Sequence, residues 1–204
     1  MMDALLALLV ATVASFIGSL QAGLVNTAVL AATLRHGPLA ARSTALGGSL
    51  PEMLYAALAF VAADQVLGYT GQWGVTPGRI SGVVMVGLGL YIALVMKPFH
   101  IKEEVQVRSG FRRGLVLGLM NPQLALFWCG VRLAMEAAGL QVQGWGAMAG
   151  FGLGAFIGAM ALLLLLIRLG GHLRERMADQ TLLRLFRALG VLLVAAGVWA
   201  WVAG

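Results

Sequence analysis

The sequence predicts an all-α integral membrane protein with six transmembrane helices, arranged as two inverted-topology three-helix repeats. Of its 204 residues, 60% are hydrophobic and only 11% are charged, whereas a soluble domain averages about 25% charged residues. The mean hydropathy is +0.91, and several apolar stretches approach the ~20 residues that cross a bilayer as a helix. A short motif that occurs once in each half, "GLVN" and "GLMN", predicts the repeat.

The composition also excludes several classes of function. A single cysteine, Cys129, and three scattered histidines provide no disulfide framework, no redox pair and no metal-ligand spacing. We therefore expect no metal and no cofactor. The net charge of +6 would favour nucleic acid in a soluble chain, but in a membrane protein basic residues determine topology. We expect no nucleic-acid partner; the expected partners are the lipid bilayer and a small-molecule substrate.

Apolar runs between charged or Gly/Pro-rich breaks predict the six spans in order. The first apolar run lacks a basic n-region and carries Asp3, so we interpret it as a retained helix and not as a signal peptide. The spans are expected at about 4–34, 40–67, 78–96, 111–137, 145–168 and 187–203. The chain is then one membrane domain, 1–204, with repeat one at about 1–96, a basic cytoplasmic linker at about 97–110 and repeat two at about 111–204.

The basic residues predict the orientation. All of the 14 Lys and Arg residues except Arg79 and Arg132 lie near the connections that follow spans one, three and five. By the positive-inside rule these connections are cytoplasmic, so both termini face outward.

The repeat is supported by residues that align at a constant offset. Phe16, Gly23 and Asn26 in the first half match Phe111, Gly118 and Asn121 in the second. With a longer offset, Gly82 aligns with Gly190, Gly89 with Gly197, and Tyr91 with Trp199. Because each half has three spans, the halves enter the membrane from opposite sides, as in secondary transporters whose site lies at the repeat interface.

Polar residues at membrane depth predict the site. An unsatisfied polar group in hydrocarbon costs several kcal/mol, so these residues must bond backbone or face a cavity or ligand. Helix breaks are expected at Gly18, Gly23, Pro51 and Pro122, since glycine and proline weaken or interrupt a helix. Each asparagine beside a break can repair the loose backbone or bind a ligand, and both roles remain open. The predicted substrate-binding residues are Gln21, Asn26, Glu52, Tyr55, Asn121 and Gln123.

Glu52 stands out because an acid at a helix centre costs roughly 2.5–3.5 kcal/mol even on the lower scales. We predict that Glu52 couples proton movement to transport or pairs with a cationic group of the substrate. The alternative is a protonated acid that bonds a neighbouring helix.

Two further patterns have alternative interpretations. Arg132 and Glu136 stand at i,i+4 and form a structural ion pair or, less simply, a substrate gate. Gly150, Gly154 and Gly158 form a small-residue ridge, which predicts close packing within the chain or a homodimer interface.

These motifs resemble those of the lysine-exporter (LysE-type) family of bacterial amino-acid exporters, with its homoserine/threonine branch. The resemblance rests on 21–26 ("QAGLVN"), on the basic-Gly turn at 35–37, on "ALGGSLPEMLYAALAF" and on "FRRGLVLGLMNPQLALFW". The family's first motif has prolines where this chain has Gln21 and Leu24. The resemblance implies a bacterial inner membrane location and proton-coupled export of amino acids or related small metabolites.

The sequence therefore predicts a secondary-active exporter that works by alternating access. No phosphate-binding loop, nucleophile triad or paired-carboxylate motif is present, so we predict that the chain is not an enzyme. The alternatives are a non-transporting membrane scaffold that kept the fold, favoured by the missing prolines, and a cation or metal exporter.

Overall fold

The computed structural model describes residues 1–20, 23–71, 76–90, 93–94, 110–121, 123–176 and short pieces between 187 and 202. Its helices are α1 (Met2–Gly18), α2 (Leu24–Gly71), α3 (Pro77–Leu90), α4 (Phe111–Leu119), α5 (Gln123–Ala137) and α6 (Gly144–Arg176). Helical turns continue within 197–202, and the described residues contain no strand. The all-α prediction is confirmed for this part of the chain.

Two helical stretches are long and apolar enough to cross a membrane, Leu24–Ala63 and Gly144–Leu169. The pair α4 and α5, bent by 66° at a short break, adds a third if it counts as one span. Helix α1 is apolar but shorter. Length and composition thus identify two or three candidate spans among the described residues, and the count of six remains a prediction.

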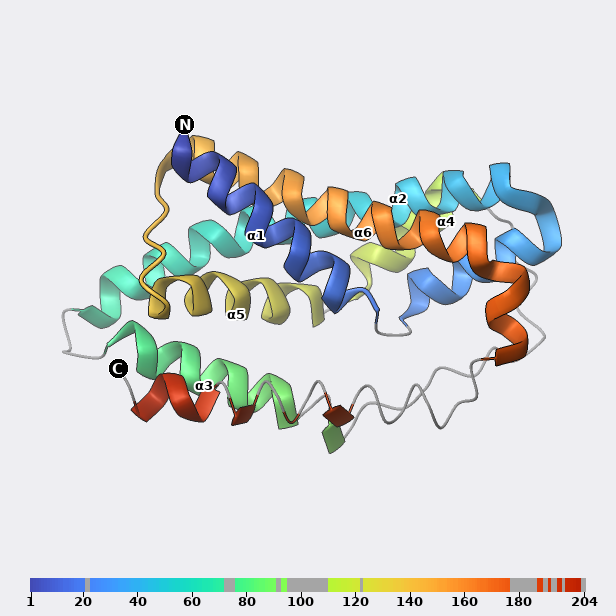
Figure 1. The fold of residues 1–204 in the computed structure, drawn as a ribbon. Helices are drawn as coiled ribbons and strands as arrows, with labels where there is room; N and C mark the ends of the chain where they lie inside the picture. The colour runs from blue at the N-terminus through green and yellow to red at the C-terminus, as the bar shows by residue number, and fades with distance from the viewer. Residues whose placement is uncertain are drawn as a thin grey trace.

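Helix α2 consists of two arms that meet at Gly37. Gly37 has φ 84° and ψ 173°, a conformation that favours glycine because it has no Cβ. Pro38 follows as the first residue of the second arm, where its missing N–H removes no helical hydrogen bond. The chain reverses direction here (Figure 1), so the predicted connection between spans one and two is a tight turn.

The two arms of α2 pack against each other and against α6. Val29 and Ala32 from the first arm and Ala41 and Ala45 from the second share a buried cluster with Leu163 and Ile167. These mostly small side chains let the helices approach closely. The reversal at Gly37 is therefore stabilised by apolar contacts on both sides.

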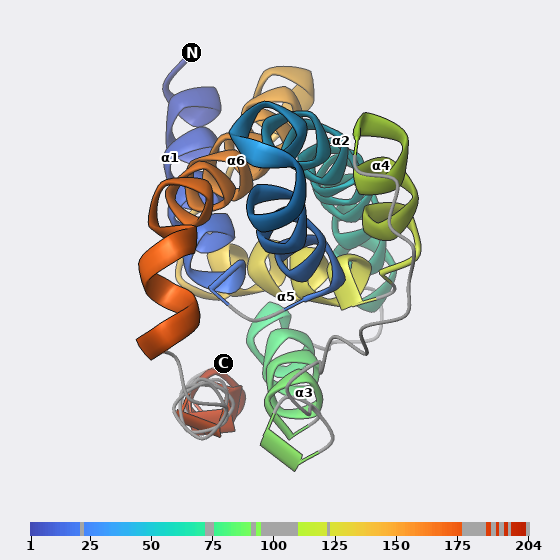
Figure 2. The same cartoon turned by 90° about the vertical axis from the view of Figure 1, so that its right-hand side faces the viewer.

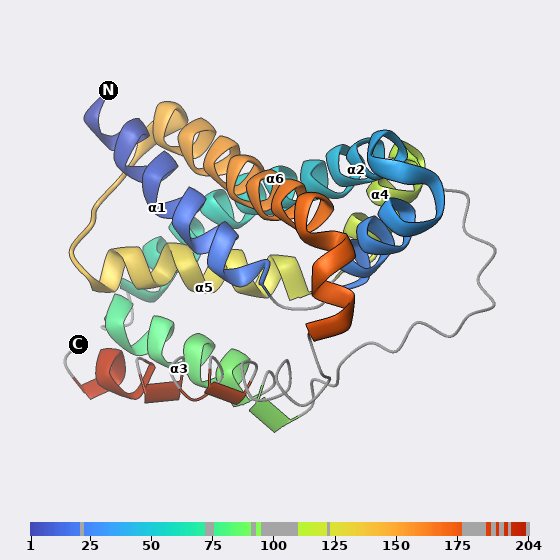
Figure 3. The same cartoon turned by 45° about the vertical axis from the view of Figure 1, so that its right-hand side comes forward.

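Two pairs of shorter helices lie end to end. Helix α1 points at the first arm of α2, and α4 points at α5 (Figures 1 and 3). Helix α6 packs along α1 and the first arm of α2, and the second arm of α2 packs along α4 and α5. The predicted span at about 4–34 therefore corresponds to two helical segments separated near 19–23, and the span at about 111–137 to α4 and α5.

The main core joins α1, α2, α5 and α6. Its largest members are Phe60, Trp128 and Phe151. The Trp128 and Phe151 rings meet edge to face with centroids 5.2 Å apart, a geometry that aromatic quadrupoles favour.

The glycine ridge of α6 faces α1. A Cβ added at Gly150, Gly154 or Gly158 would overlap the α1 backbone near Ala4, Leu8 and Thr12. The structure thus shows the intramolecular alternative for this ridge. Because α1 covers the three glycines, the homodimer interface predicted through Gly150, Gly154 and Gly158 has no free surface there.

The same kind of contact joins α2 to α4. A Cβ at Gly114 would overlap the backbone at Thr44 and Gly48, and one at Gly47 would overlap Phe111. The N–H of Gly110 also donates to Thr44 Oγ1 at 3.0 Å. This contact fixes the start of α4 beside the second arm of α2, near the Gly37 turn.

Helix α3 lies on the outer side of α5, together with the helical turns at 197–202 (Figure 2). A Cβ at Gly82 would lie 2.7 Å from the Gly197 carbonyl oxygen, and one at Gly197 would lie 2.8 Å from the Gly82 carbonyl oxygen. The two segments therefore touch backbone to backbone. The comparison of the two halves of the sequence aligned Gly197 with Gly89. In the structure Gly197 contacts Gly82.

Candidate functional site

A cavity of about 90 Å³ lies where the two pairs of helices are interrupted. Gly18 and Ser19 from the end of α1, residues 23–26 at the start of α2, and Asn121, Gln123, Leu124 and Phe127 around the start of α5 line it. Gly48 and Glu52 from the second arm of α2 and Ala159 and Leu163 from α6 complete the lining. Since one water needs roughly 10–15 Å³ by this measure, the cavity has room for several waters or a small solute group.

The cavity unites four of the six predicted substrate-binding residues: Asn26, Glu52, Asn121 and Gln123. They come from three segments that are far apart in the sequence. The predicted pairing of the two asparagines across the halves is thus matched by their position at one cavity.

Glu52 is the one carboxylate in the part of the cavity lining that the structure describes. Its residue is only 6% exposed, and the hydroxyl of Ser19 lies 3.5 Å from Oε1 as a long hydrogen-bond donor. Among the described residues that line the cavity, none is basic. A carboxylate in such a place can accept a proton or pair with a cationic group.

Both asparagines repair helix ends. Asn26 Nδ2 donates to the Ser19 carbonyl oxygen at 2.6 Å and so ties the start of α2 to the end of α1. Asn121 Oδ1 accepts from the backbone N–H of Gln123 at 3.2 Å, as an N-cap side chain does. Both residues also line the cavity, so their repair of the helix ends leaves them beside it, and ligand binding by them stays a prediction.

The predicted helix breaks have different outcomes. Gly18 ends α1 and Gly23 precedes α2, so the chain is interrupted where these glycines were expected to interrupt it. The break between α4 and α5 includes position 122, and Pro122 itself lies outside the described residues. Pro51 was predicted as a break, which is wrong: it is buried within α2, whose non-helical residue is Gly37.

Tyr55 does not line the cavity as the described residues form it. The Tyr55 hydroxyl donates to the Leu119 carbonyl oxygen at 2.8 Å, so it bonds a backbone group that the end of α4 leaves without a helical partner. The structure thus assigns it to the helix break and not to the cavity wall. Gln21 lies outside the described residues.

The residues at the cavity that were not predicted as part of it include Ser19, Gly48 and Phe127. Ser19 approaches Glu52, Gly48 leaves space that Val25 fills, and Phe127 packs where Gly18 has no side chain. The adjacent glycines at 47 and 48 were a signal of close helix contact. Which helix they contact depends on tertiary packing, which the sequence pattern does not contain.

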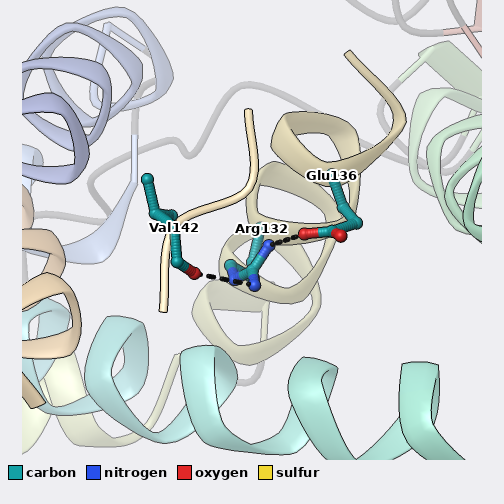
Figure 4. A network of polar contacts seen from close by, with 3 residues as sticks. All are labelled: Arg132, Glu136 and Val142. Atoms are coloured by element: carbon teal, nitrogen blue, oxygen red, sulfur yellow. Dashed lines mark hydrogen bonds and ion pairs between the residues drawn. The ribbon is translucent and has the colours of Figure 1, made fainter. Parts of the chain in front are cut away.

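A second buried polar group, drawn in Figure 4, lies in the C-terminal half of α5 and is not among the residues that line the cavity. Arg132, 1% exposed, pairs with Glu136 at 2.9 Å and donates to the Val142 carbonyl oxygen at 3.2 Å. Its guanidinium carbon also lies 4.8 Å from the centre of the Phe60 ring. Arg132 therefore fastens the α5–α6 connection to the bundle, which supports the structural interpretation of this pair.

Comparisons of this chain with protein-family models, with curated proteins and with solved structures find no match.

Proposed function

We propose that this protein is a secondary-active exporter of amino acids or related small metabolites, coupled to protons and working by alternating access. The observation that carries the proposal is the cavity at which two helix interruptions meet beside Glu52. Interrupted helices that face a binding site near the membrane centre are typical of secondary transporters.

The packing supports two inverted three-helix repeats. In the proposed repeat one, α1 and the first arm of α2 form span one, the second arm forms span two, and α3 belongs to span three. In repeat two, α4 and α5 form span four and α6 forms span five. In this arrangement α1 corresponds to α4, and α6 corresponds to the second arm of α2. The contact of α1 with α6 therefore has its counterpart in the contact of α4 with α2, and both are among the most extensive in the bundle.

The cavity lining supports a zwitterionic substrate. Glu52 is suited to an ammonium group, and the first residues of α2 and α5 line the same space. Helix N-termini carry partial positive charge and favour a carboxylate. A substrate with one group of each sign would then span the distance between Glu52 and the two helix starts.

In this mechanism Glu52 alternates between a proton and the substrate ammonium group. Protonation from the outside releases the ammonium group, and loss of the proton to the cytoplasm restores the carboxylate for the next substrate. The coupling follows because one carboxylate holds either cation but not both.

The test is transport by the purified full chain in proteoliposomes, with a panel of amino acids and with or without a pH gradient. We expect gradient-dependent movement of at least one amino acid. Glu52→Gln removes the charge with little change of shape, so we expect transport to fall to background. Asp3→Asn is the matched control, since Asp3 is exposed in the first turn of α1, and we expect wild-type rates.

The same assay distinguishes the alternatives. Movement of none of the amino acids by a folded protein would favour the scaffold, and movement of a metal or simple cation that depends on Glu52 would favour the cation exporter. Full transport by Glu52→Gln would refute the role assigned to this carboxylate.

A further inference from the structure

A second hollow, separate from the cavity at Glu52, lies along α6 and holds two arginines. Arg42 of α2 and Arg168 of α6 line it together with apolar side chains, among them Phe16, Ala161, Leu164 and Leu165. Its volume of about 620 Å³ lies within the roughly 300–1,000 Å³ typical of small-molecule sites. We call it the Arg42–Arg168 groove.

The position of the groove matches the edge of a bilayer. Arg168 is in the last turn of the candidate span Gly144–Leu169, and Arg42 is just over one turn beyond the Gly37 reversal. Leu164 and Leu165 lie deeper along α6, and Phe16 of α1 lies beside α6 near Gly158. The groove therefore has its charged end at headgroup depth and its apolar part within the hydrocarbon.

Within the described part of the chain, neither guanidinium has an ion pair or a side-chain hydrogen bond. The acidic residues whose side chains are described lie elsewhere: Asp3 is at the start of α1, Glu52 is in the cavity, and Glu136 pairs with Arg132. Two positive groups that line one groove without a described counter-charge favour an anion, and the planar guanidinium suits phosphate oxygens in particular.

We propose that the Arg42–Arg168 groove binds one anionic phospholipid. The headgroup phosphate lies between the two guanidinium groups, and an acyl chain follows Phe16, Leu164 and Leu165. Basic pockets between membrane helices on the cytoplasmic side hold anionic headgroups by the same chemistry. If the two arginines served only to orient the protein in the membrane, no apolar groove beside them would be needed. A free phosphate ion would leave the apolar part of the groove unfilled.

In the test, the purified full chain is titrated with phosphatidylglycerol or with phosphatidylcholine. Native mass spectrometry then measures how many lipid molecules the protein retains. We expect retention of one phosphatidylglycerol and no comparable retention of phosphatidylcholine. The double variant Arg42→Gln/Arg168→Gln removes charge-assisted hydrogen bonds, so we expect its apparent affinity for phosphatidylglycerol to fall by about tenfold or more.

Two further variants separate the site from general charge. Arg35→Gln/Arg112→Gln removes two exposed charges from the same end of the bundle but lies outside the groove, so we expect unchanged retention. Ala161→Phe fills the groove and leaves both arginines in place, so we expect weaker phosphatidylglycerol binding. Thermal unfolding of each variant checks that it is folded.

The proposal fails if the charge-control variant loses phosphatidylglycerol as strongly as the groove variant, or if both lipids are retained equally. It also fails if inorganic phosphate displaces phosphatidylglycerol at similar concentrations, because that result would indicate an anion site that does not use the acyl chain.

Discussion

Asn26 and Asn121 each use one side-chain atom to repair a helix end while lining the cavity. The Asn26 amide donates to a carbonyl at the end of α1, and the Asn121 carbonyl oxygen accepts from the start of α5. The sequence predicted both residues because a polar side chain in an apolar run needs a partner. The sequence also predicted Tyr55 as a site residue, because it lies one helical turn from Glu52. In the structure its hydroxyl bonds the Leu119 carbonyl oxygen instead.

Replacing Asn121 separates its structural role from its site role. Asn121→Ala removes the acceptor for the Gln123 N–H, and loss of such a cap costs about 0.5–2 kcal/mol. We expect a lower thermal unfolding temperature for this variant in detergent. Asn121→Ser keeps a short acceptor, so its stability should stay near wild type, and any loss of transport in it would belong to the cavity. Equal stability of the alanine variant and wild type would contradict the capping role.

Arg132 predicts a strong asymmetry between single and double replacement. Arg132→Met leaves Glu136 without its partner in a largely buried place, and breaking such a pair costs about 3–5 kcal/mol. We expect Arg132→Met/Glu136→Leu to be more stable than Arg132→Met alone, because no charge is left uncompensated. Thermal unfolding of both variants measures the difference. A double variant less stable than Arg132→Met would show that the uncompensated Glu136 charge is not the main cause of the lost stability.

At the scale of helices, glycine positions decide where elements bend and how closely they pack. The sequence predicted a break at Pro51, but the second arm of α2 is continuous there and the reversal is at Gly37. A buried proline can remain in a helix when neighbouring groups accommodate it, and here Gly118 packs directly on the Pro51 ring. Local sequence does not reveal such a neighbour, which is why this break was predicted incorrectly.

The contact between α1 and α6 can be tested with single methyl groups. Gly154→Ala places a Cβ against the Leu8 carbonyl, and such overpacking costs about 1–3 kcal/mol. Gly146→Ala on the same helix meets only Ala4 Cβ at 3.8 Å, an ordinary contact. We expect lower thermal stability for Gly154→Ala and an unchanged or slightly raised value for Gly146→Ala, since alanine favours helix. A similar loss for both variants would contradict the packing explanation, because Gly146 has no close contact of the kind found at Gly154.

At the scale of the whole molecule, the predicted helical class is confirmed for the described residues, while the six spans and their inversion stay predictions. Hydropathy predicted the apolar segments well, because it depends on composition. Hydropathy alone treats 4–34 as one segment, and it was the glycines Gly18 and Gly23 that predicted its division into two helices. The contacts that hold this break, from Asn26 and Phe127, depend on tertiary packing.

The proposed topology places the Gly37 turn in the cytoplasm and the start of α6 outside. Leu39 and Trp145 are 78% and 82% exposed and lie at opposite ends of the bundle. In a Cys129→Ser background, we expect Leu39→Cys to react with a membrane-impermeant maleimide only from the cytoplasmic side. Trp145→Cys should react only from the outside, and labelling of both from one side would exclude this topology.

The short length of α4 has a consequence for how the protein is made. At about 1.5 Å per residue, its 9 residues reach roughly 14 Å and cannot cross ~30 Å of hydrocarbon. In the proposed arrangement the insertion machinery therefore cannot release α4 into lipid until α5 has been synthesised, and the break with Asn121 must enter as the middle of one unit. We infer that the pair α4 and α5 inserts as one unit, and that the cavity is complete only after α6, which contributes Ala159 and Leu163 to its lining, has joined the bundle.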